Sequence, residues 1–359
     1  MDKAAANFLD PNAPISFRLW WGLTFCALAM GLIFLLAPYS GDIEFAADKG
    51  DFWYLWQLQN PTALTRLSAW VPFVLHNAAL WFLIYQAQRA KSRYVKGLHW
   101  FNVWALGINA FFIMLHIVQT KYFYDGLAQD VHEATSMMSV VIMVFMIYIM
   151  ENKRRGIFFG KPVPLKSFNE IGQTLRKYHG YYFSWAIVYT FWYHPIEMTA
   201  GHLAGFAYMF LLLLQSSLFF TRFHTNRVWT MLLETIFLVH GAFVAAFVMN
   251  PEDHTFWSMF LFGGMAVFLI THLHGLGLSS RGKLMLATPF VAAIVGFYSL
   301  FPQYLVGLAR MPATMYFGTA LLFVIIWLFI RFGELLNRAF GAVTVANSHE
   351  GHLTSDNNL

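Results

Sequence analysis

Residues 67–88 read LSAWVPFVLHNAALWFLIYQAQ, and residues 89–96, which follow directly, read RAKSRYVK. The first stretch contains no Asp, Glu, Lys or Arg. It has the length that a helix needs to cross about 30 Å of hydrocarbon. The second stretch is rich in Lys and Arg, as short connections on the cytoplasmic side of a membrane are. Together they predict a membrane-spanning helix followed by a cytoplasmic turn.

The same pattern recurs along the whole chain. Ten apolar runs of sufficient length lie at 17–38, 67–88, 98–119, 130–151, 181–198, 201–221, 228–249, 256–277, 284–306 and 312–333. The ninth is interrupted near its end by Pro302 and Gln303. The composition agrees, because 11% of the residues are charged, against roughly 25% in soluble domains. The sequence therefore predicts an all-α, polytopic transmembrane helix bundle of about ten spans.

The basic residues decide the expected orientation. Of the 23 lysines and arginines, only Lys49, Arg66, Lys121 and Arg310 fall in connections on the side opposite to RAKSRYVK. The positive-inside rule then places both termini in the cytoplasm. We expect a multi-pass protein of the cell inner membrane whose main partner is the lipid bilayer. Topology accounts for the positive charge, so no nucleic-acid partner is expected.

Two long connections divide the chain. Residues 39–66 include Tyr54 and Trp56, and they are expected either to lie on the membrane interface or to cap the bundle. A stretch at Ser167–Tyr178 has apolar residues at helical spacing beside basic ones, which predicts an amphipathic helix on the inner membrane surface. The expected segments are a cytoplasmic N-terminus at 1–16, spans one to four at 17–151, a cytoplasmic amphipathic connection at 152–180, spans five to ten at 181–339, and a disordered cytoplasmic tail at 340–359.

Histidines gather in the outer half of the predicted spans. At 1.5 Å per helical residue, six of them fall there, namely His76, His116, His132, His194, His202 and His240. Glu133 and Glu197 lie beside two of them. Ionisable residues inside a membrane usually face the bundle interior or a watery cavity. They are therefore candidates for a functional site, although each histidine alone also fits an interfacial anchor or a buried ring bonded to a neighbouring helix.

The densest piece is HPIEMTAGH at 194–202, which presents two imidazoles and a carboxylate across one tight turn. Such ligands suit iron, copper, zinc or manganese. Cys26 is the only cysteine, so no thiolate metal cluster is possible. The histidine boxes of membrane desaturases, the paired histidines of stacked b-type haems and the adjacent pair of haem–copper oxidases are also missing. A transition-metal site with iron or copper, or a haem held by two helices, survives these exclusions.

Three interpretations remain open. The first is a metal-dependent membrane oxidoreductase with the six histidines as metal ligands, Glu133 and Glu197 as catalytic carboxylates, and a lipophilic or quinone-like substrate. The second is a proton-coupled or metal-ion transporter, whose relay would continue inward through Glu234 and reach His272 and His274. The third is an accessory subunit of a larger membrane complex. Beside the lipid bilayer, the candidate partners are a redox partner or a larger membrane complex.

Overall fold

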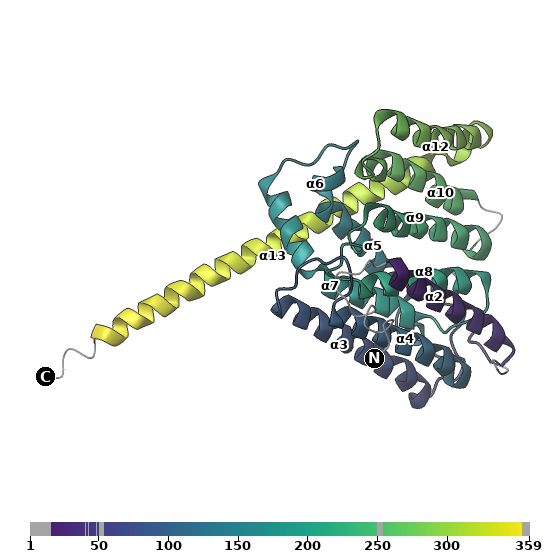
Figure 1. The fold of residues 1–359 in the computed structure, drawn as a ribbon, viewed down its shortest axis with the longest axis horizontal. Coiled ribbons are helices and arrows are strands. Elements are labelled where there is room, and N and C mark those ends of the chain that lie inside the picture. Colours follow the sequence, from purple (N-terminus) through teal and green to yellow (C-terminus); the bar gives the residue numbers. More distant parts are fainter. Residues whose placement is uncertain are drawn as a thin grey trace.

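The computed structural model describes residues 16–39, 41, 43–47, 49, 54–249 and 254–353, without the side chains of 16–18, 248–249 and 338–353. Within these ranges the chain is helical, with isolated β-bridges but no β-strand. The long helices, drawn in Figure 1, are α2 (Ser16–Leu36), α3 (Ala63–Arg89), α4 (Trp100–Phe123), α5 (Glu133–Met150), α7 (Lys166–Tyr193), α8 (Ala200–Ser217), α9 (Arg227–Val244), α10 (His254–Val267), α12 (Ser280–Leu300) and α13 (Leu305–Leu353). Two short helices are α6 (Asn152–Arg155) and α11 (Leu273–Gly275). Two π-helical segments, Ala245–Met249 and Phe268–His272, extend α9 and α10.

Each predicted span coincides with one long helix of the described chain. Eight helical stretches are long and apolar enough to cross a membrane, and α7 and α8 are the two that fall short. For α7 the reason is its charged first half, and for α8 it is His202 near the start and polar residues at 215–217 near the end. The prediction of an all-α polytopic membrane bundle is confirmed.

Three boundaries refine the expectations. The ninth span ends at Leu300, where the predicted interruption forms a 3₁₀ turn, Pro302–Tyr304. The amphipathic stretch and the fifth span form one continuous helix, α7, because no proline separates them and Gly180 is tolerated inside a helix at modest cost. The helix α13 is drawn to Leu353, but 354–359 lie outside the described residues, so the disordered tail stays a prediction.

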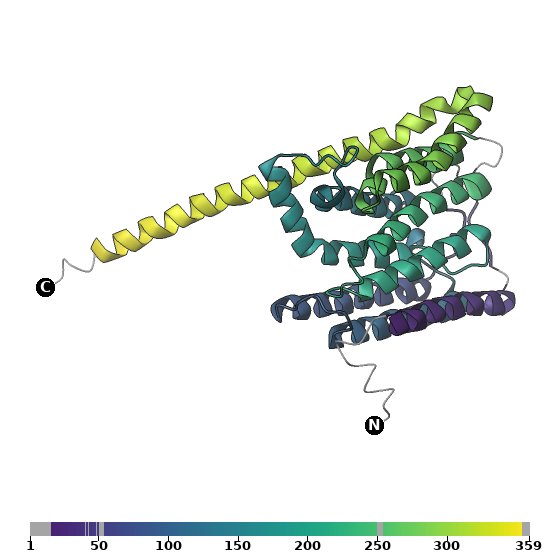
Figure 2. The same cartoon turned by 45° about the horizontal axis from the view of Figure 1, so that its top comes forward.

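Alternate connections meet at opposite ends of the bundle, as alternating spans require. The connections at 90–99 and 218–226 are joined by the hydrogen bond from Arg222 N to Val95 O, at 2.8 Å. We call this end, which carries most of the basic residues, the inner side. At the other end, the outer side, Leu58 N donates to Gln129 Oε1 at 2.9 Å. Figure 2 shows the helices between these ends lying roughly side by side.

The interior of the bundle is built mainly by α3, α4, α7 and α8. Phe191, Trp192, Tyr193 and Phe210 are fully buried there. By contrast, α12 lies at the edge of the bundle in Figure 1, and most of its large apolar side chains are exposed. Exposed apolar surface on this scale is typical of helices whose solvent is lipid.

Candidate functional site

Four of the six predicted histidines lie together near the outer side, and we call them the outer histidine group. His116 comes from α4, His194 from the residue after α7, His202 from the first turn of α8 and His240 from α9. The ring centroids of His194 and His202 are 5.7 Å apart. His194 also interacts electrostatically with the other three rings. Four separate elements therefore converge on one place.

The local sequence explains the turn between α7 and α8. Pro195 disfavours helical backbone at the residue before it, and His194 is extended, with φ of −101° and ψ of 137°. The helix α7 accordingly ends at Tyr193. The next helix begins where Thr199 accepts a hydrogen bond from His202 N at 3.3 Å. Proline and threonine thus hold the two histidines at either end of a short turn.

The outer connection covers this group, as one of the two expectations for residues 39–66 predicted. The Tyr54 hydroxyl lies 3.0 Å from His202 Nε2. The Tyr54 ring centroid is 4.9 Å from that of His194, and the Trp56 ring centroid is 5.3 Å from that of His202. These aromatic side chains form a cap between the histidines and the outer aqueous phase.

The hydrogen bonds of His202 suit a group that changes its protonation state. Its Nδ1 lies 2.7 Å from Thr199 Oγ1, and its Nε2 lies 3.0 Å from the Tyr54 hydroxyl. A hydroxyl group both donates and accepts. The ring therefore keeps both hydrogen bonds whether it is neutral or protonated.

His116 has a different pair of partners. Its Nδ1 lies 2.9 Å from Gln119 Oε1, and its Nε2 lies 2.9 Å from the carbonyl oxygen of His194. Both partners are acceptors, so both bonds form only when both ring nitrogens carry hydrogen. In the structure, Gln119 Nε2 donates to the carbonyl oxygen of Asp125 at 3.0 Å. The opposite orientation of the Gln119 amide would place two acceptor oxygens against each other there. The two hydrogen bonds of His116 thus require two ring hydrogens, whereas its complete burial disfavours the positive charge that they bring.

The remaining two members of the group have unused nitrogens. Nδ1 of His194 and Nδ1 of His240 are buried and have no hydrogen-bond partner. The His240 ring lies against Gly205, where a Cβ atom would stand 3.6 Å from its Cε1. Among the described residues, no three His, Cys, Asp or Glu side chains form an arrangement that could hold a metal ion. Two imidazole nitrogens therefore have no hydrogen-bond partner, but the described residues do not assemble a complete set of metal ligands.

The other two predicted histidines have local structural partners. His76 Nε2 lies 2.7 Å from Asn109 Oδ1, and Trp192 Nε1 donates to His76 Nδ1 at 3.3 Å. A neutral ring satisfies this pair completely. His132 is exposed and caps α5, where its Nδ1 accepts from Ala134 N at 3.1 Å. His132 therefore lies apart from the outer histidine group, whereas His76 has its own hydrogen-bond partners but still interacts electrostatically with His116.

Carboxylates lie near the outer histidine group without completing a set of metal ligands among the described residues. Glu133 begins α5, and Glu197 accepts a hydrogen bond from Met198 N at 3.3 Å. Both interact electrostatically with Tyr54. Asp125, which the sequence did not single out as a site residue, is 2% exposed and has an unpartnered Oδ2. Burial raises the pKa of the Asp125 carboxyl to about 6.

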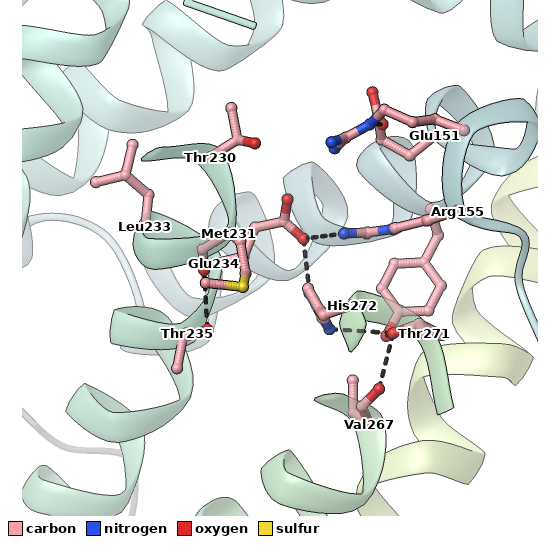
Figure 3. A network of polar contacts seen from close by, with 12 residues as sticks. Glu151, Arg155, Thr230, Met231, Leu233, Glu234, Thr235, Val267, Thr271 and His272 are labelled. Atoms are coloured by element: carbon pink, nitrogen blue, oxygen red, sulfur yellow. Dashed lines mark hydrogen bonds and ion pairs between the residues drawn. The ribbon is translucent and has the colours of Figure 1, made fainter. Parts of the chain in front are cut away.

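A second buried polar site lies toward the inner side, and we call it the inner triad (Figure 3). Glu234 Oε2 of α9 lies 2.7 Å from Arg155 Nη1 of α6 and 2.7 Å from His272 Nε2. The Glu234 side chain is 11% exposed, and that of Arg155 is 3% exposed. Charged groups this deeply buried are rare in membrane-spanning helices and usually functional.

Neighbouring hydroxyl groups extend the triad. Thr271 Oγ1 lies 3.0 Å from His272 Nδ1, and the Tyr148 hydroxyl lies 3.4 Å from Thr271 Oγ1. Arg155 also lies over the Tyr148 ring, 5.3 Å from its centroid. His272 ends the π-helical segment Phe268–His272, and such segments are frequent at functional sites. His274 is not part of this network, so the two histidines of the His-x-His pair have separate surroundings.

The two sites are linked along α9. Glu234 and His240 are six residues apart, which corresponds to about 9 Å along a helix. Tyr208 of α8 lies next to His240 and interacts electrostatically with Glu234. Its hydroxyl donates to Leu233 O at 3.1 Å, and its ring centroid is 6.2 Å from that of His240.

Comparison with family models, with curated proteins and with solved structures finds no match for this chain. The function is therefore argued from the geometry alone.

Sequence reasoning missed Tyr54 and Arg155. In the sequence, Tyr54 is one of several aromatic residues of an outer connection, and Arg155 is one of several basic residues that set the orientation. No local signal distinguishes Arg155 from Lys153 and Arg154 beside it. Its partner Glu234 does carry a signal, because a glutamate inside an apolar run is rare.

Proposed function

We propose that this protein is a proton-coupled membrane transporter in which the outer histidine group and the inner triad are successive proton-binding sites. The observation that carries the proposal is their connection along α9. Glu234 and His240 share this helix, and Tyr208 lies next to His240 and interacts electrostatically with Glu234. Gaps of a few ångströms between buried polar groups are commonly bridged by ordered water.

The chemistry of each site supports this function. His202 keeps its hydrogen bonds in either protonation state because both of its partners are hydroxyl groups. Glu234 shares one oxygen between Arg155 and His272. His272 donates its Nε2 hydrogen to the ionised carboxylate, so the ring can take up a further proton at Nδ1, beside the Thr271 hydroxyl, and pass the Nε2 hydrogen to Glu234. We place the protein in the cell inner membrane, with the inner side toward the cytoplasm.

Proton flux into vesicles tests the proposal. The purified protein is reconstituted into liposomes that contain a pH-sensitive dye, and a potassium gradient with valinomycin imposes a membrane potential. We expect acidification that Glu234→Gln and His202→Ala reduce to the level of protein-free vesicles. The reason is that each substitution removes one proton-binding group from the series.

Two matched variants serve as controls. Glu334→Gln removes a carboxylate of α13 that is 44% exposed and pairs with Arg331. His132→Asn removes an exposed histidine but keeps a helix-capping side chain. Both should conduct like the unchanged protein. Flux that never exceeds that of empty vesicles, under a potential of either sign, contradicts the proposal.

A second candidate function is the membrane oxidoreductase with iron, copper or haem. The observation in its favour is the pair of buried, unpartnered nitrogens on His194 and His240. An apolar cavity of about 320 Å³ between α2, α4 and α8 also offers room for part of a lipophilic or quinone-like substrate. Against it stands the incomplete ligand set, since both nitrogens of His116 and His202 already have partners.

Metal analysis separates the two functions. The protein is purified in detergent, its visible spectrum is recorded before and after dithionite, and bound metals are measured by mass spectrometry. A haem spectrum or stoichiometric iron or copper that His194→Ala removes supports the oxidoreductase. A colourless, metal-free protein that still conducts protons rejects it.

A further inference from the structure

The inner connection between α5 and α7 folds against the inner triad, and we call residues 151–163 the inner plug. It consists of α6 and a tight turn in which Ile157 N donates to Lys161 O at 3.1 Å. Positive φ angles at Gly156 and Gly160, +69° and +77°, allow the turn to form. Asn152 closes the plug, because Val163 N donates to its Oδ1 at 2.8 Å.

The plug is attached to the helices that form the inner triad. Phe159 N donates to Ile270 O at 2.9 Å, within the π-helical segment that ends at His272. The Tyr316 hydroxyl donates to Ile157 O at 2.7 Å. Gly275 has no side chain, and a Cβ atom there would stand 2.9 Å from Arg155 Cβ. The stem of Arg155 thus passes close to α11 on its way to Glu234.

Arg155 is the only residue through which the plug reaches Glu234 in the described network of Figure 3. Its Nη1 binds Glu234 Oε2, while its buried Nη2 has no partner. The Arg155 guanidinium therefore covers the Glu234 carboxylate on the side of the inner connection between α5 and α7. The neighbouring Arg154 pairs instead with Glu151 of the plug itself.

We infer that the inner plug is a gate, and that Glu234 exchanges protons with the inner aqueous phase only when the plug withdraws Arg155. This inference rests on the proposed proton-transport function. A fixed positive charge beside a carboxylate disfavours its protonation. Besides the Arg155–Glu234 ion pair and the apolar packing of Ile157, the attachments of the plug are single hydrogen bonds, each of modest net strength. Their release moves Arg155 together with the plug.

The structure provides a site for locking the gate. A Cβ atom on Gly160 would stand 3.5 Å from His274 Cβ, within the roughly 3.5–4.5 Å that a disulfide needs. The chain has one cysteine, Cys26. Cys26→Ser therefore gives a background in which Gly160→Cys with His274→Cys makes one defined cross-link, opened by reductant. Gly160→Cys and His274→Cys alone are the controls, and the first also shows whether a side chain is tolerated at this φ.

Two readouts are measured on oxidised and reduced protein. Proton flux should be lost on oxidation and recovered on reduction. Labelling of Glu234 by a water-soluble carbodiimide, followed by mass spectrometry, should occur in the reduced form and be suppressed in the oxidised form. Equal labelling in both forms, or labelling in neither, overturns the gate. If oxidation suppresses the labelling of Glu234 but no proton flux is seen in either form, the gate is supported and the transport function is rejected.

A substitution without a cross-link gives an independent test. Arg155→Gln should raise the rate of carbodiimide labelling at Glu234, because it removes the guanidinium that covers the carboxylate. Arg154→Gln, its neighbour in sequence, should leave this rate unchanged. If the two variants label Glu234 equally, Arg155 does not guard the carboxylate and the inference is wrong.

Discussion

The strongest prediction concerns the energetic coupling within the inner triad. Arg155→Met and Glu234→Leu each remove one partner of an ion pair whose side chains are 3% and 11% exposed. The double variant replaces both partners with apolar side chains. The three variants and the unchanged protein form a double-mutant cycle, which measures the interaction between the two positions.

The magnitude follows from the burial of the pair. Removing one partner of a buried ion pair leaves the other charge uncompensated and typically costs about 3–5 kcal/mol. For Arg155→Met we expect about 3 kcal/mol, at the lower end, because His272 remains 2.7 Å from the Glu234 carboxylate. Replacing both members of such a pair with apolar residues is often neutral. The double variant should therefore cost much less than the sum of the single variants.

The assay is reversible unfolding of the detergent-solubilised protein, followed by circular dichroism as the fraction of denaturing detergent increases. The free energy of unfolding is compared across the four proteins. A coupling energy of about 2 kcal/mol or more supports the reasoning. Costs that simply add, so that the double variant is the least stable of all, would show that the pair is not electrostatically coupled and refute it.

Three further predictions concern the outer side. Gly205→Leu should abolish proton flux because a side chain there displaces the His240 ring. Gly107→Ala should leave the flux unchanged, because a Cβ atom at this position has no neighbouring atom within 4 Å. Equal flux in the two variants contradicts the role of the His240 position. Burial raises the pKa of Asp125 from 3.8 to about 6, so between these values the unfolded chain loses its proton first and the contribution of Asp125 to stability falls as pH rises, by about 2–3 kcal/mol. The free energy of unfolding of the unchanged protein minus that of Asp125→Asn should therefore fall by this amount between pH 4 and pH 7, and an unchanged difference would contradict the effect of burial. Tyr54→Phe deletes the hydroxyl that lies 3.0 Å from His202 Nε2 and should lower the free energy of unfolding by about 1 kcal/mol. An unchanged value would show that this hydrogen bond adds no net stability.

Much of the fold was predictable from local sequence. The run at 67–88 became α3, and the pair Pro302 and Gln303 ended α12, because apolar length and helix-breaking residues act over a few positions. The boundary within α7 was not predictable in this way. Residues 166–178 and 181–193 differ in polarity, but neither contains a proline, so a change of environment did not require a break.

The candidate site was predictable only in outline. Depth along each span placed all six histidines toward the outer end of the bundle, and the structure brings His116, His194, His202 and His240 together there, whereas His76 and His132 have partners of their own. These two differ in their partners, Asn109 with Trp192 for one and the α5 backbone for the other. Position along a helix says how deep a side chain lies, whereas its bonding depends on which neighbouring helix it faces.

The sequence by itself determined that this chain is a bundle of membrane helices, because transfer into lipid depends on the summed hydropathy of each segment. Only the tertiary structure decided which charged groups meet. Lys153, Arg154 and Arg155 are alike in sequence, yet α6 and the turn after it direct Arg155 alone to Glu234, 79 positions further along the chain. Burying a charge is tolerated only where an opposite charge stands within a few ångströms, and that distance is a property of the folded bundle.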